Sequence, residues 1–187
     1  PDLRLSSTGS GNELFVELKR LQRGDYEIEE QRRHMEIFRK LEPFLHEQRL
    51  SVDVDVTYVK ELADVPVDYL LQQVKHMLES SILLSDGYSW RDQLGSGLIR
   101  DANVAAVRND TRESYLYFGT KMARLLSGRV VSERNYHLTA ETSVYPEDPR
   151  YIDQMKFGSV VTWQCIAQEA IERKAKYVRS KLSEADK

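Results

Sequence analysis

The chain has 187 residues, of which 41% are hydrophobic and 30% charged, and its formal net charge is −3; this length favours a single domain, because domains commonly have about 100–200 residues. No apolar run approaches the ~20 residues needed to cross a bilayer, and the slight net acidity does not indicate a general nucleic-acid binder, so any such surface must be local. The single cysteine, Cys165, excludes an internal disulfide framework and is typical of a cytoplasmic protein.

The first predicted elements are two strands joined by a turn. Segments Leu3–Ser6 and Glu13–Lys19 are strand-like, and the turn between them is rich in Gly, Ser and Asn, which favours a hairpin. Such a hairpin would bring Asp2 close to Glu17. Because residues two apart in a strand point to the same face, Lys19 would lie beside Glu17. The sequence therefore predicts two carboxylates and an ammonium group on one face of the hairpin.

A helix and a third strand follow the hairpin. Apolar residues recur at helical spacing over residues 26–49, and in segment 51–59 valines alternate with Asp53, Asp55 and Thr57. The alternation predicts a strand with one polar face, on which we expect the two aspartates to be solvated. The order strand, helix, strand predicts a βαβ crossover in which segments 13–19 and 51–59 are parallel neighbours, or near neighbours, in one sheet.

The rest of the chain predicts further helices and strands. The patterns indicate helices at 65–80 and 111–128, a strand at 98–107, a hairpin at 129–145 and a closing helix at 160–185. The four histidines show no metal-ligand spacing and are expected at the surface or packed in the interior. Cys165 is expected to be a buried small residue. A strand that begins beside Pro1 and a helix that runs to Lys187 indicate a piece of a longer protein.

Three features coincide near the start of the chain: Pro1-Asp2, a hairpin turn, and Glu17-Leu18-Lys19 on a strand followed by a helix and another strand. This pattern resembles the PD-(D/E)xK nuclease superfamily, which has the restriction-endonuclease-like fold. The resemblance implies one α/β domain over residues 1–187, with a mixed β-sheet and flanking helices. Residues 1–60 would form the motif-bearing core, without its first helix and strand, and residues 61–187 an α+β extension.

The resemblance also implies roles for individual residues. Asp2 and Glu17 would bind Mg²⁺, or Mn²⁺ as a substitute, with the backbone carbonyl of Leu18 as a further ligand. Lys19 would orient the attacking water or stabilise developing charge. Phosphodiester hydrolysis needs a nucleophilic water and neutralised phosphate charge, and a carboxylate-held metal ion supplies both. These residue types therefore fit a metal-dependent nuclease.

The expected partner is nucleic acid, DNA first and RNA as the other substrate, with no membrane partner. Arg20 and Arg23 follow the motif directly and are expected to contact phosphate oxygens. A homodimer is a second partner that the sequence leaves open. An alternative also stays open, in which Glu17 and Lys19 form an exposed ion pair on an edge strand. The chain would then be a catalytically inactive nuclease-like module that binds nucleic acid or protein.

Overall fold

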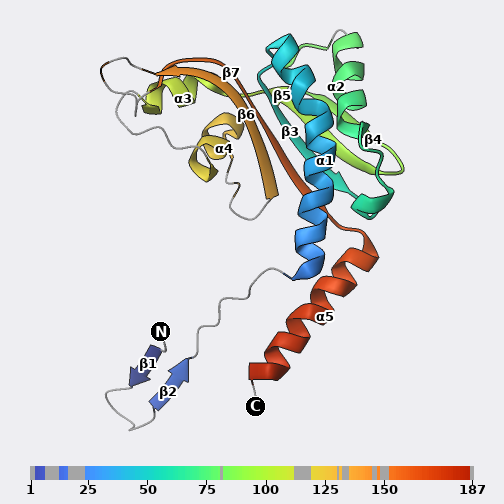
Figure 1. Cartoon of the computed structure of the whole chain (residues 1–187), viewed down its shortest axis with the longest axis vertical. Coiled ribbons are helices and arrows are strands. Elements are labelled where there is room, and N and C mark those ends of the chain that lie inside the picture. The colour runs from blue at the N-terminus through green and yellow to red at the C-terminus, as the bar shows by residue number, and fades with distance from the viewer. Residues whose placement is uncertain are drawn as a thin grey trace.

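The computed structural model describes residues 3–6, 13–16, 24–80, 82–111, 119–129, 131, 135–144, 147 and 152–185. They form a five-stranded mixed sheet with helices on both faces, and a separate two-stranded sheet (Figure 1). This architecture confirms the predicted α/β class. Within the described ranges, no helix combines the length and the apolar character that a membrane span requires.

The N-terminal hairpin is present. Strand β1 (Leu3–Ser6) pairs antiparallel with β2 (Glu13–Val16), and Leu3 lies opposite Val16 at the open end of the ladder. The pairing of these two segments confirms the prediction from the turn composition. The two strands form a sheet of their own, apart from the five-stranded sheet (Figure 1).

The five-stranded sheet has the order β4-β5-β3-β7-β6. Its centre is β3 (Val52–Tyr58), which pairs antiparallel with β5 (Gly95–Asp101) and parallel with β7 (Ile152–Cys165). The outer strands are β4 (Tyr88–Arg91) and β6 (Asn135–Val144), and each is antiparallel to its neighbour. Strand β3 therefore has a partner on both edges.

The prediction that segments 13–19 and 51–59 share one sheet is wrong for the described strands. A strand has two edges, and those of β3 are occupied by β5 from Val52 to Tyr58 and by β7 from Asp53 to Tyr58. No edge of β3 is left for β2. The parallel neighbour of β3 comes instead from the opposite end of the chain, and the βαβ crossover predicted from the order of the elements, from β2 through α1 to β3, is absent from the described strands.

The strand β7 also corrects the predicted closing helix. Residues 160–165, Val-Val-Thr-Trp-Gln-Cys, belong to the strand, and helix α5 (Gln168–Ala185) begins only after it. Valine, threonine and tryptophan favour strands, and pairing with β3 decides between two readings of a short apolar run. The predicted strand 98–107 is right only up to Asp101, and the predicted hairpin 129–145 is instead one strand, β6, paired with β7.

Helices α1 (Asp25–Gln48) and α2 (Tyr69–Glu79) cover one face of the sheet, and the short 3₁₀ turn η1 (Leu62–Asp64) precedes α2 (Figure 1). Helix α1 continues through Pro43. Helices α3 (Val104–Thr111) and α4 (Thr120–Ser127) cover part of the other face. Gly128 ends α4 in the left-handed conformation, at the position where the sequence predicts a stop.

Candidate functional site

The residues of the predicted nuclease site lie outside the described part of the chain. They are Asp2, Glu17, Leu18, Lys19, Arg20 and Arg23. The structure reaches this site only through the neighbouring pairs of the β1–β2 ladder, of which Leu3 opposite Val16 is the closest. The predicted geometry of the carboxylates and the lysine therefore stays a prediction.

A network of charged side chains lies on the face of β3 opposite α1. The carboxylate of Asp53 accepts a hydrogen bond from Arg129 Nη2 at 2.6 Å and another from Arg100 Nε at 2.9 Å. Arg129 Nη1 also donates to Asp55, so that one guanidinium group bridges two carboxylates. Thr162 on β7 donates from Oγ1 to Asp55 Oδ1 at 3.2 Å. The two aspartates are therefore tied to arginines on the described part of this face.

The expectation that Asp53 is solvated is wrong, because its side chain is only 1% exposed. Burial raises the pKa of the Asp53 carboxyl, and the adjacent guanidinium groups of Arg129 and Arg100 oppose that rise. The Val-Asp alternation in the sequence identified the face on which this network lies. No local pattern identified the arginines, which are 47 and 76 residues away along the chain.

A cavity of about 480 Å³ opens on the same face and adjoins the charged network at Asp55. Its volume is in the range of ligand pockets, which have about 300–1,000 Å³. The lining residues come from three adjacent strands: Asp55, Thr57, Ser89, Trp90, Arg91, Ser96, Gly97 and Leu98. The composition of this lining, with hydroxyl groups, the cation of Arg91 and the carboxylate of Asp55, suits a polar ligand.

The turn between β4 and β5 is fixed by hydrogen bonds to Tyr69 at the start of α2, on the face of the sheet opposite the polar row of the cavity. Asp92 accepts hydrogen bonds from the backbone amides of Leu94 at 2.8 Å and Gly95 at 3.0 Å, and from Tyr69 Oη at 2.9 Å. Trp90 Nε1 donates to the same Tyr69 oxygen at 2.9 Å. The indole of Trp90 crosses directly over Gly97, where an added Cβ would collide with it. A glycine is therefore required at this crossing.

A stack of rings is buried between α1 and the sheet. His34 is 0% exposed, and its imidazole lies between the imidazole of His137 and the indole of Trp163. The distances from its ring centroid to theirs are 5.0 and 4.3 Å. His34 Nε2 is 3.1 Å from Tyr58 Oη. Each of these three rings has a buried nitrogen that finds no hydrogen-bond partner among the described residues: His34 Nδ1, His137 Nε2 and Trp163 Nε1. Burial lowers the pKa of His34 well below its usual value and that of His137 to about 4.

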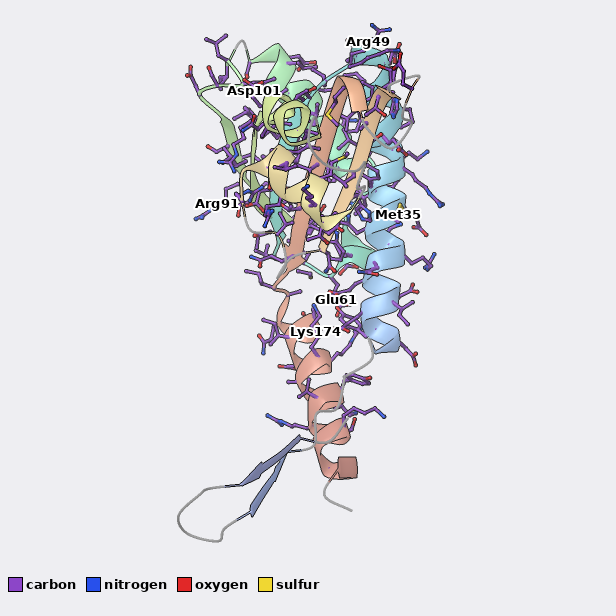
Figure 2. The ribbon with its side chains drawn as sticks, turned by 90° about the vertical axis from the view of Figure 1, so that its left-hand side faces the viewer. Met35, Arg49, Glu61, Arg91, Asp101 and Lys174 are labelled. Atoms are coloured by element: carbon purple, nitrogen blue, oxygen red, sulfur yellow. The ribbon has the colours of Figure 1, made fainter. Side chains whose placement is uncertain are left out.

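Two ion pairs at the edge of the core join α5 to α1 and to the residue before η1. Lys174 Nζ lies 2.9 Å from Glu30 Oε2, and Arg173 lies 3.0 Å from Glu61 Oε1 (Figure 2 labels Lys174 and Glu61). Cys165 beside them is buried, and burial raises the pKa of its thiol. The burial of Cys165 confirms the prediction of a buried small residue. Its raised pKa disfavours the thiolate, which is the reactive form of cysteine.

Neither a group of metal ligands among the described residues nor a similarity to a known protein points to a further site. Among the side chains that the structure describes, no three of His, Cys, Asp and Glu are grouped so that they could hold a metal ion. The chain matches no protein-family model, no curated protein and no solved structure.

Proposed function

We propose that the chain carries the active site of a metal-dependent nuclease, in which Asp2 and Glu17 bind Mg²⁺ or Mn²⁺ and Lys19 assists the attacking water. The observation that supports this proposal is the register of the hairpin. Because Leu3 lies opposite Val16, a ladder continued by one residue would pair Asp2 with Glu17. Opposite residues of an antiparallel pair have Cβ atoms about 4.5–5.5 Å apart, close enough for two carboxylates to share one cation.

The chemistry needs the hairpin and not the whole family core. The family resemblance also implied that β2 lies beside β3, and the sheet order is against this pairing. The convergence of Asp2, Glu17 and Lys19 depends only on the antiparallel ladder and on the rule that residues two apart share a face. The proposal therefore rests on local geometry and residue types, with the carbonyl of Leu18 as a further ligand and Arg20 and Arg23 as phosphate contacts. We propose DNA as the substrate and the cytoplasm as the compartment.

The test is cleavage of plasmid DNA and of single-stranded RNA by the purified chain, with Mg²⁺, with Mn²⁺ and with EDTA. We expect metal-dependent cleavage that Lys19→Ala lowers about a hundredfold or more, because a group that assists proton transfer typically contributes that much. Lys40→Ala is the matched control, since Lys40 is exposed on α1. A metal-replete chain that cuts neither nucleic acid would contradict the proposal, as would equal cleavage by the Lys19 and Lys40 variants.

A catalytically inactive binding module is the second candidate. The observation that favours it is the cavity on the polar face, which lies on the well-packed five-stranded sheet and needs no residue of the hairpin. Such a module would bind nucleic acid or protein, alone or as a homodimer, without hydrolysis. Binding of nucleic acid that persists without metal, and without any cleavage when metal is added, would favour this candidate over the nuclease.

A further inference from the structure

One row of polar side chains crosses the cavity from the edge strand to the centre of the sheet. Arg91 on β4 lies opposite Ser96 on β5, and Ser96 lies opposite Thr57 on β3. Neighbouring strands are about 4.8 Å apart, so the row spans about 10 Å across the sheet. All three residues line the cavity. A ligand in the cavity therefore meets a guanidinium group and two hydroxyl groups together.

The polar groups of this row are available to a ligand. The side chains of Arg91 and Ser96 form no hydrogen bond or ion pair with any other described residue. Thr57 Oγ1 accepts from Gln164 Nε2 at 3.0 Å, which orients its hydroxyl group so that the proton can be donated elsewhere. Figure 2 shows Arg91 at the outer margin of the molecule, where a ligand can reach it from solvent.

The balance of charge around the row favours an anion. The carboxylates of Asp53 and Asp55 are matched by the guanidinium groups of Arg100 and Arg129. Asp92, which follows Arg91 in the chain, is engaged by Tyr69 and by two backbone amides. The charge of Arg91 therefore has no carboxylate partner among the described residues. Guanidinium and hydroxyl groups together are the usual protein contacts of phosphate oxygens.

We propose that this cavity binds a phosphate group of a nucleic-acid strand, with Arg91 as the cation and Ser96 and Thr57 as hydroxyl donors. The choice of a nucleic-acid ligand rests on the proposed nuclease function, and the site itself lies on residues that the catalytic proposal does not use. A free nucleotide offers the same phosphate chemistry. The strand is favoured because the lining crosses three adjacent strands, β4, β5 and β3, over about 10 Å, which is longer than one phosphate group needs.

The test measures binding of a fluorescein-labelled 20-nucleotide oligothymidylate by fluorescence anisotropy, with the full chain and with EDTA to prevent cleavage. We expect Arg91→Ala to weaken binding about tenfold or more, as loss of a hydrogen bond to a charged group does. It should also reduce the slope of log Kd against log salt concentration by about one, because one phosphate contact is lost. Arg91→Lys should recover part of the affinity, and Ser96→Ala should weaken binding about twofold.

The matched control is Arg32→Ala, because Arg32 is an exposed arginine on α1 that is paired with Glu29 and Glu36. Its affinity and salt dependence should equal those of the unmodified chain. Equal binding by the Arg91 and Arg32 variants would overturn the proposal. Thymidine monophosphate and inorganic phosphate are added as competitors in separate titrations. If the oligonucleotide does not bind, but thymidine monophosphate or inorganic phosphate binds in a way that requires Arg91, the proposed nucleic-acid ligand is wrong. The site would then bind a free phosphate compound.

Cleavage assays separate this proposal from the nuclease proposal. If Lys19→Ala abolishes cleavage and Arg91→Ala raises KM with kcat unchanged, both proposals are supported. If no metal supports cleavage but binding still depends on Arg91, the catalytic proposal fails and the phosphate site stands. If cleavage occurs with a KM that is the same for the Arg91 variant, the phosphate site fails and the nuclease proposal stands.

Discussion

The two faces of β3 are both buried near the start of the strand, but different interactions stabilise them. Val52, Val54 and Val56 are 0% exposed and pack against the helix layer of α1 and α2. Asp53, which lies between the first two valines, is 1% exposed and is bonded to two arginines. The apolar face gains stability from removal of hydrocarbon from water, whereas the polar face needs its charges paired. Burial by itself therefore does not tell which interaction holds a side chain.

Both faces leave some buried polar atoms unsatisfied. On the polar face, Asp53 is bonded through both carboxylate oxygens, but Arg129 Nε is buried without a partner among the described residues. On the apolar face, the stacked rings of His34 and Trp163 each leave one buried nitrogen without a partner among the described residues. A buried polar atom without a hydrogen bond costs about 1–3 kcal/mol. Some of the packing energy of the apolar face is therefore offset by its own ring nitrogens.

The largest expected effect is on the apolar face. Trp163→Ala should lower the free energy of unfolding by about 4 kcal/mol, because it leaves a cavity beside His34 and removes a stacked ring. Trp163→Phe should cost clearly less, since it keeps an aromatic ring and removes the unpartnered N–H group. Urea denaturation measures both. Equal losses for the two variants would show that the indole nitrogen, rather than packing, makes the main contribution.

The polar face should show a smaller but asymmetric effect. Arg129→Met should lower the free energy of unfolding by about 3 kcal/mol, because it leaves the buried Asp53 with Arg100 alone. Asp53→Ala should cost less, since Arg129 and Arg100 are 26% and 37% exposed and can regain water. Urea denaturation of both single variants and the double variant gives the coupling energy. Additive losses, with no coupling, would show that the network does not act as a unit.

Acid should weaken the apolar face through its histidines. Their pKa values lie below the unfolded value of about 6.5, so between about pH 6.5 and pH 4 the unfolded chain binds protons that the folded chain excludes. Above about pH 6.5 the histidines are neutral in both states, so they should not lower the free energy of unfolding. Below it, stability should fall by up to about 1.4 kcal/mol per pH unit for each histidine.

The measurement is urea denaturation between pH 4 and pH 8 for the unmodified chain and for His137→Phe. The variant should show a shallower decline, because it has lost one titrating group from the stack. His76→Gln is the matched control, since it removes a histidine that is exposed on α2 and lies outside the stack. A profile for His137→Phe that is as steep as that of the control would contradict the assignment to buried imidazoles.

The smallest effect is expected where the polar face opens to solvent. Ser96→Ala should change the free energy of unfolding by less than about 0.5 kcal/mol, because the hydroxyl group has no partner among the described residues. The same variant should weaken oligonucleotide binding. A loss of stability as large as that of Arg129→Met, measured in the same urea titrations, would instead assign Ser96 to the structural network.

Short-range patterns predicted the elements in which local chemistry is decisive. The Gly- and Asn-rich turn gave the β1–β2 hairpin, and the helical spacing of Phe38, Leu41 and Leu45 gave α1 almost to its ends. These predictions succeed because a turn residue or a helical face depends on neighbours within a few positions. Ile28, which shares that spacing, is 55% exposed because it lies beyond the part of α1 that packs on the sheet.

The sequence by itself determined the alternation along β3, and with it the existence of an apolar and a polar face. Only the tertiary structure decided that Asp53 is buried beneath Arg100 and Arg129, and that Arg91, Ser96 and Thr57 form one row. It also decided that β7 rather than β2 lies beside β3. The physical reason is that alternation is a property of one strand, whereas pairing is a contact between residues about 100 positions apart along the chain, as the 107 positions between Asp55 and Thr162 show.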